Sequence, residues 1–164
     1  MELTIRKSTF DDLEDIKKII SISRELMIAR GNPNQWGKTR PSLEVLINDI
    51  EKENSYVCIK DGQVVGCFAL VYGEDPTYQE IYQGQWSADL PYWTIHRLGS
   101  DGLTCGVGQA CFAFAKEQGP YLRVDTHQEN TAMIKAIKRA GFKNCGIIFV
   151  EDGSPRIAFD FLKK

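Results

Sequence analysis

Gly106 and Gly108 lie where a predicted strand runs into a predicted helix, and this arrangement could bind an anion. Glycine has no Cβ atom, so a ligand can approach the backbone closely at both positions. The unpaired N–H groups of the first helical turn, together with the helix dipole, then favour a negative charge. A pyrophosphate is a suitable ligand for such a loop. The alternative interpretation is a tight turn that needs two glycines for its own geometry.

Two other phosphate-binding motifs can be compared with this segment. A Walker loop ends in Gly-Lys-Ser or Gly-Lys-Thr, and this loop has no such ending. A dinucleotide-binding loop of an oxidoreductase has a third glycine where this chain has Cys111. That loop also has an acidic residue about 20 positions further on, and Asp125 lies 19 residues after Gly106 (125 − 106). The dinucleotide alternative stays open, although antiparallel hairpins predicted upstream argue against it.

The elements that must position this loop can be predicted from hydrophobic periodicity and turn residues. Helices are expected at about residues 11–31, 41–50, 109–119 and 130–140, and strands at 3–7, 55–60, 63–72, 92–98, 121–126, 142–150 and 156–162. Asp61-Gly62 between two strands indicates a type I′ hairpin. The pattern predicts an α/β (α+β) fold: a mixed, mostly antiparallel central sheet of about seven strands flanked by about four helices.

Composition limits the classes of protein and partner. The 164 residues favour one domain, 1–164. The 20 basic and 22 acidic residues leave a net charge of −2, which disfavours binding to nucleic acid or an anionic membrane surface. No apolar run approaches the ~20 residues of a membrane span, and the first residues do not resemble a signal peptide, so we expect a cytoplasmic protein. Five cysteines without a C-x-x-C pair and only two histidines predict no metal site.

Three motifs together resemble the GNAT superfamily of acetyl-CoA-dependent N-acetyltransferases over nearly the whole chain. They are Ile95-His96-Arg97-Leu98 followed by Gly106-Val107-Gly108, then Asp125-Thr126-His127-x-x-Asn130, then Ala140-Gly141-Phe142. The predicted order of elements is similar to that of the family as well. The resemblance implies transfer of an acetyl group from acetyl-CoA to a primary amine of a small molecule or peptide, by direct attack within one ternary complex.

The resemblance also implies which residues bind acetyl-CoA. Backbone N–H groups at the glycine loop would hold the pyrophosphate, namely those of Gly106, Val107, Gly108, Gln109 and Ala110. The backbone of Leu98 and Ser100 would pair with the pantetheine arm, and an N–H group there would polarise the thioester carbonyl. Asn130 would bond the arm of the cofactor. Its position before a predicted helix is equally well explained by an N-cap.

Two positions depart from the family pattern. The family usually has Arg or Gln three residues before the first glycine, where this chain has Leu103. The tyrosine that often protonates the departing thiolate falls at Ile137. A protein that binds acyl-CoA with little turnover is therefore a second hypothesis.

The sequence offers several candidates for the catalytic base and for the walls of the acceptor site. His96 is one candidate base, and alternation places it with Thr94 on the strand face opposite Ile95 and Arg97. Its alternative role is a structural histidine. Glu80, in the long connection 74–91, is the other candidate base, or else a solvated carboxylate. Three aromatic residues in loops could contact a cationic amine or simply pack under the loops: Trp36, Tyr82 and Trp86. The final hairpin could pair with another copy to form a homodimer or face solvent.

Overall fold

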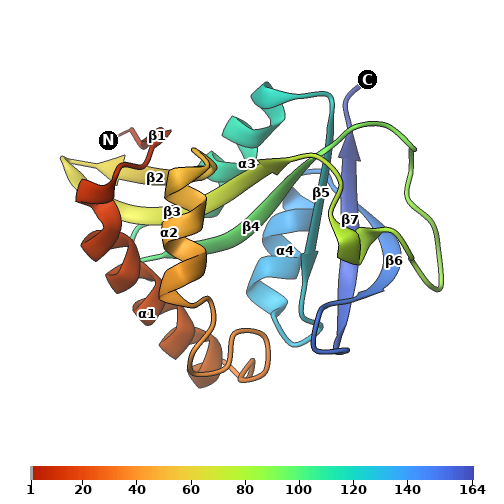
Figure 1. Ribbon diagram of the computed structural model, residues 1–164, viewed down its shortest axis with the longest axis horizontal. Helices are drawn as coiled ribbons and strands as arrows, with labels where there is room; N and C mark the ends of the chain where they lie inside the picture. Colours follow the sequence, from red (N-terminus) through yellow and green to blue (C-terminus); the bar gives the residue numbers. More distant parts are fainter. Residues whose placement is uncertain (1) are drawn as a thin grey trace.

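A computed structural model describes residues 2–164 as one seven-stranded sheet with helices on both faces (Figure 1). The strand order is β1-β2-β3-β4-β5-β7-β6. The strands are β1 (Thr4–Lys7), β2 (Ser55–Lys60), β3 (Gln63–Tyr72), β4 (Trp93–Ser100), β5 (Tyr121–Thr126), β6 (Lys143–Phe149) and β7 (Pro155–Leu162). The helices are α1 (Leu13–Ala29), α2 (Leu43–Glu51), α3 (Val107–Gln118) and α4 (Thr131–Arg139), with short 3-10 turns η1 (Phe10–Asp12) and η2 (Pro76–Tyr78). The predicted fold class is confirmed.

Strands β1 to β4 pair with one another in antiparallel fashion, as the predicted hairpins require. Asp61 and Gly62 both have positive φ, 53° and 76°, which is the geometry of a type I′ turn. An antiparallel first half is incompatible with a dinucleotide-binding fold, in which the phosphate loop follows the first of several parallel strands. The dinucleotide alternative is therefore excluded.

Apolar side chains form a separate core on each face of the sheet. Helices α1 and α2 cover one face, and their core includes Ile16, Ile20 and Val57. Helices α3 and α4 cover the other face, where Phe112, Leu122 and other buried residues pack together. None of the helices formed by the described residues is long and apolar enough to cross a membrane.

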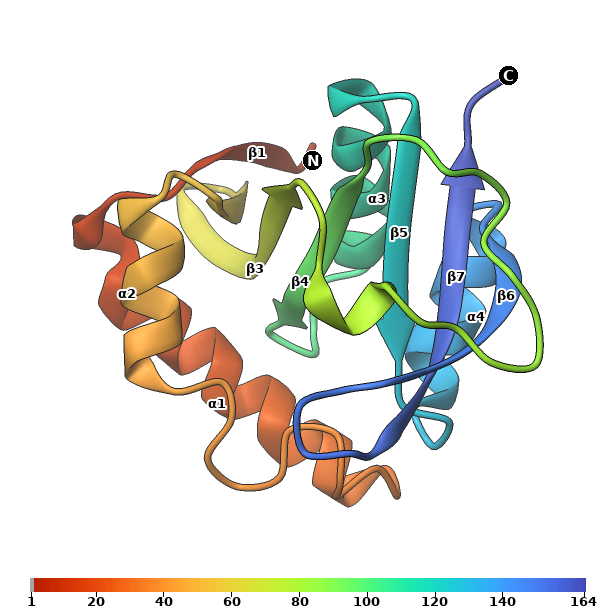
Figure 2. The same cartoon turned by 45° about the vertical axis from the view of Figure 1, so that its right-hand side comes forward.

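The parallel strands β4 and β5 are paired only at one end. Trp93 faces Leu122 and Thr94 faces Arg123, and beyond these two pairs the strands separate. Figures 1 and 2 show the two ribbons diverging, with α3 and α4 behind them. The β4 edge beyond Thr94 therefore faces an opening in the sheet instead of a neighbouring strand.

A β-bulge in β4 changes which side chains face α1 and α2. Gly99 pairs with Cys67 and His96 pairs with Ala69, so two residues of β4 stand opposite one residue of β3. Arg97, at the bulge, has a φ of 54°. Its guanidinium contacts Asp49 of α2, on the same face as His96. The expectation of strict alternation is thus wrong at Arg97, because a bulge places successive side chains on one face.

The connection between β3 and β4 crosses to the far edge of the sheet (Figure 2). Tyr82 exchanges two backbone hydrogen bonds with Ile147 of β6, with N···O distances of 2.9 and 2.8 Å. The contact is close enough to require glycine, since a Cβ atom at Gly84 would lie 2.0 Å from the Cys145 carbonyl oxygen. The outer edge of β6 is thus partly covered by the chain itself.

Candidate active site

Two cavities meet in the opening between β4 and β5. The first has a volume of about 210 Å³ and lies between α1, the start of α3 and the start of α4. The second has a volume of about 500 Å³ and lies under the α1–α2 loop. Both are lined by Met27, Leu98 and Met133. A molecule in one cavity can therefore reach a molecule in the other beside Leu98.

The first cavity includes the start of α3. Gly106 adopts a left-handed conformation with φ of 84°, and within residues 2–164 no side chain accepts a hydrogen bond from the first turn. The Ala110 N–H already donates to the Gly106 carbonyl at 3.0 Å. The amides of Val107, Gly108 and Gln109 precede the first intrahelical bond and are the donors that this turn presents.

Gly108 and Leu98 form a narrow part of the first cavity. A Cβ atom at Gly108 would lie 4.0 Å from Leu98 Cδ2 and would meet nothing closer. The backbone of Ser100, in contrast to that of Leu98, is hydrogen-bonded to a side chain of α1. The Ser23 hydroxyl accepts from the Ser100 N–H at 2.9 Å and donates to the Ser100 carbonyl at 3.0 Å. Ser100 is thus fixed to α1 at the wall of this cavity.

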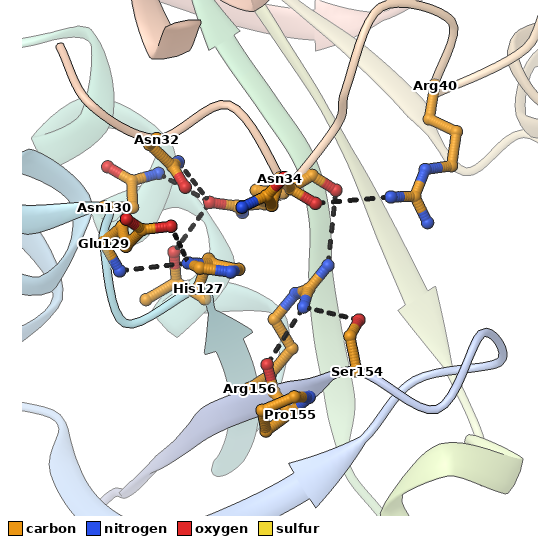
Figure 3. Close-up of polar contacts among 11 residues, drawn as sticks. Asn32, Asn34, Arg40, His127, Glu129, Asn130, Ser154, Pro155 and Arg156 are labelled. Carbon is orange, nitrogen blue, oxygen red and sulfur yellow. Dashed lines mark hydrogen bonds and ion pairs between the residues drawn. The ribbon is translucent and has the colours of Figure 1, made fainter.

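Asn130 is confirmed as the N-cap of α4. Its Oδ1 accepts from the Met133 N–H at 3.1 Å, and its Nδ2 donates to Gln35 Oε1 at 2.9 Å. Asn32 donates to the same Gln35 oxygen at 2.9 Å. The α1–α2 loop is therefore attached to the start of α4, between the two cavities (Figure 3). Asn32 is buried in the wall of the first cavity, and its Oδ1 has no hydrogen-bond partner among residues 2–164.

His96 lines the second cavity and pairs with a carboxylate that lies outside the cavity lining. His96 Nε2 is 3.2 Å from Asp75 Oδ2, which comes from the turn before η2. Burial opposes ionisation of Asp75, but hydrogen bonds from His96 and from the Thr77 side chain and N–H lower its pKa to about 2. The carboxylate stays ionised near neutrality. It orients the ring so that Nδ1 is the nitrogen left to accept a proton.

A second carboxylate faces this pair from β5. Asp125 lines the same cavity, and its Oδ2 accepts a hydrogen bond of 2.6 Å from the buried Tyr78 hydroxyl. Burial raises the pKa of Asp125, while the hydrogen bond from Tyr78 and the nearby charges of His96 and Arg156 oppose this rise. Asp75 and Asp125 together make this end of the cavity attractive to a cation.

The structure brings some of the predicted site residues together and separates others. His96 and Trp36 both line the second cavity, although Trp36 also packs in the core under α1 and α2. Glu80 and Tyr82 instead bond to each other, exposed near the β6 edge. Trp86 stacks on Arg123 in a separate surface hollow. Ile137 is fully buried in the core and reaches neither cavity.

Sequence reasoning missed the partners of these residues. Asp75, Tyr78 and Gln35 lie in loops without periodicity, and each reaches the site only through the tertiary fold. The Asp-Pro sequence before η2 was the one local signal for Asp75, because it marks a turn start.

Comparison with known proteins identifies the family. A sequence model described as an acetyltransferase (GNAT) domain matches residues 2–143. The chain belongs to the GNAT acetyltransferase family. It is therefore an acetyltransferase, as the motifs predicted. A comparison with curated protein sequences gave no significant match.

Solved acetyltransferase structures share the fold over the whole chain. A GNAT acetyltransferase from Streptococcus agalactiae is 27% identical, with a TM-score of 0.89 over 99% of this chain and 96% of that one. A ribosomal-protein-alanine N-acetyltransferase from Brucella melitensis is 19% identical, with a TM-score of 0.65 over 97% and 99% of the two chains. An agmatine N-acetyltransferase is 11% identical, with a TM-score of 0.67 over 99% and 100%. The latter two similarities concern the fold alone.

Proposed function

We propose that this protein transfers the acetyl group of acetyl-CoA to a primary amine of a small molecule or peptide by direct attack in a ternary complex. The observation that carries this proposal is the meeting of two cavities at Leu98, one with backbone donors and the other with a histidine–carboxylate pair. Two fold neighbours are named for amine acceptors, a ribosomal-protein alanine and agmatine, which supports the amine class.

Two features of the first cavity support the binding of acetyl-CoA there. Its wall includes Val107 and Gly108, whose unpaired first-turn amides, with that of the adjoining Gln109, would bind the pyrophosphate. The unpartnered Asn32 Oδ1 needs a donor, and the amide groups of a pantetheine arm provide donors. Leu98 and Ser100 on β4, together with Asn130, would border this arm. A free N–H of β4 would polarise the thioester carbonyl.

His96 is the proposed catalytic base. An ammonium ion attracted by Asp75 and Asp125 must lose a proton before its nitrogen can attack, and His96 Nδ1 would accept that proton. The new C–N bond then forms at the thioester carbonyl carbon, the C–S bond breaks, and the sulfur leaves with the electron pair. The pair His96–Asp75 has the base-plus-orienting-group arrangement found in other nucleophilic sites.

Departure of the thiolate needs no tyrosine at the usual position. Ile137 is apolar, is buried in the core and lines neither cavity, so it donates no proton to the sulfur. A thiol is acidic enough to leave as its thiolate near neutral pH. The proton held by His96 can then pass to solvent, and the second proton, which attack leaves on the new amide nitrogen, passes to the departing sulfur or to solvent.

Two measurements test this function. Thermal unfolding with acetyl-CoA at about 100 times its Kd should show roughly 2.7 kcal/mol of added stability, whereas NAD should add none. Thiol release with a broad amine panel should then depend on both acetyl-CoA and amine. Stabilisation without thiol release for any amine would instead favour a protein that binds acyl-CoA without turnover. Absence of stabilisation by acetyl-CoA would contradict the proposal.

A further inference from the structure

Arg156 is a buried cation in the wall of the second cavity. It is the second residue of β7, next to the β6–β7 turn, and only 4% of its surface is exposed. Its Nη1 donates to Ser154 Oγ and to the Pro155 carbonyl, both at 2.9 Å, and its Nη2 donates to the Gln35 carbonyl at 3.3 Å (Figure 3). All three acceptors are uncharged.

The other two arginines of this cavity are paired with carboxylates. Arg97 holds Asp49 through Nε and Nη2, both at 2.7 Å. Arg40 contacts Asp152 at 3.1 Å. Arg156, the most buried of the three, has no carboxylate oxygen within 4 Å among residues 2–164. Its five N–H bonds make three hydrogen bonds, so two donors, including Nε–H, have no partner in the described part of the chain.

A buried guanidinium without an anion is costly, because burial removes the solvation of its charge. Burial indeed lowers the pKa of Arg156, and Asp125 and Asp152 offset this only at longer range. Support of the α1–α2 loop explains the bond to Gln35, but a neutral donor would serve that purpose at lower cost. An arrangement of this kind is expected where a ligand supplies the missing negative charge.

We propose that the acceptor is an amine that also carries a compact oxyanion, a carboxylate or phosphate, which binds to Arg156 while the amine lies toward His96 and Asp125. This inference rests on the proposed function, because it names the substrate class of the same site. The cavity would then hold the acceptor by complementary charges at two points. Such binding fixes the orientation of the amine relative to Leu98, where the two cavities meet.

The first test compares acceptors on the unmodified protein. Glycine, β-alanine and 4-aminobutanoate vary the separation of amine and carboxylate, and their amides keep the shape without the charge. Aminomethylphosphonate and 2-aminoethylphosphonate distinguish phosphate-like groups from carboxylates. We expect kcat/KM for the best anionic amine to exceed that of its neutral counterpart by roughly 10- to 100-fold, as for a charged hydrogen-bonded contact. Equal or better use of the neutral amines would overturn the inference and leave the proposed function intact.

The second test removes the cation. Arg156→Gln should abolish the preference by lowering kcat/KM only for the anionic amines, and Arg156→Lys should retain part of it. Arg139→Gln removes the same charge from an exposed position of α4 outside both cavities, and it should keep the full preference. A preference that survives in folded Arg156→Gln would assign the anion to another residue and overturn the inference.

A binding measurement separates failure of this inference from failure of the proposed function. Thermal shifts are recorded with CoA plus each amine for the unmodified protein and for Arg156→Gln. An anionic amine that stabilises only the unmodified protein supports the acceptor class even if no acetyl transfer occurs. If neutral amines are acetylated but no anionic amine stabilises the protein, the function stands and the role of Arg156 is wrong.

Discussion

The two cavities are built in different ways. The first uses backbone amides and a glycine at the start of α3, enclosed by mixed apolar and polar side chains from α1, β4 and the start of α4. The second uses titratable side chains of β4, β5 and β7 and of the α1–α2 loop, and the β3–β4 connection supplies Asp75 as the partner of His96. Backbone recognition tolerates changes of side chain, whereas recognition by side chains changes with each substitution. The chain thus combines a cavity suited to one constant ligand with a cavity whose chemistry is adjustable.

The largest expected effect comes from filling the first cavity. Gly108→Trp would place a large side chain against Leu98 and occupy the 210 Å³ volume. Thermal stabilisation by acetyl-CoA, about 2.7 kcal/mol at 100 times Kd, should disappear together with turnover. Gly108→Ala is the matched control, since its Cβ atom has ordinary contacts at 4.0 Å. A stabilisation that is unchanged in Gly108→Trp would place the acetyl-CoA site elsewhere.

The next largest effect is expected from substitutions at the second cavity, which leave the first cavity unchanged. His96→Asn should lower kcat by about 10²–10⁴-fold, the usual contribution of a general base, and thermal stabilisation by acetyl-CoA should stay the same. Asp75→Asn can still accept the Thr77 bonds but loses the charge that orients the imidazole, so a smaller loss of kcat is expected. For each variant, steady-state kinetics measure kcat, and thermal unfolding measures the stabilisation by acetyl-CoA. Similar kcat values for His96→Asn and the unmodified protein would exclude His96 as the base.

A third prediction tests whether position 137 belongs to the core or to the active site. Ile137→Tyr restores the residue that the family often has, but here the position is fully buried. Overpacking should lower the free energy of unfolding by about 1–3 kcal/mol without raising kcat. Urea unfolding and initial rates would check this, with Ile137→Leu as a control of similar volume. A faster enzyme would show that this face of α4 can reach the thiolate.

The smallest expected effect concerns His127, in the turn between β5 and α4. His127 Nδ1 accepts from the Glu129 N–H at 3.0 Å, which requires a neutral ring. Burial lowers the pKa of His127, Arg156 lowers it further, and Glu129 partly opposes both. The folded-state pKa of His127 lies below the unfolded value of about 6.5. The contribution of the neutral ring to the free energy of unfolding is therefore present above pH 6.5 and is lost as the pH falls through the folded-state pKa.

Urea unfolding at several pH values measures this contribution, which corresponds to one hydrogen bond of about 1 kcal/mol. His127→Asn keeps an acceptor at this position but does not titrate, so its unfolding free energy should depend less on pH over the same range. An identical pH dependence in both proteins would assign the effect to other groups.

The same contrast explains what the sequence could predict. Periodicity and turn residues locate the strands, the Asp61-Gly62 hairpin and the glycine loop, because local physics determines each of them. The N-cap role of Asn130 also follows from its position before a helix. The pairing of His96 with Asp75 brings together residues 21 positions apart (96 − 75), and the contact of Arg156 with Gln35 spans 121. Such contacts depend on the complete fold, and the bulge at Arg97 defeats simple alternation.

The hydrogen bonds between Tyr82 and Ile147 have a consequence for the behaviour of the protein at high concentration. Exposed strand edges are templates on which further chains can add and aggregate. Here one edge strand is partly occupied by the protein's own connection, and the other, β1, is four residues long and carries Arg6 and Lys7. Shortness and charge are two of the devices that limit such growth, so this architecture discourages fibril formation at both margins of the sheet.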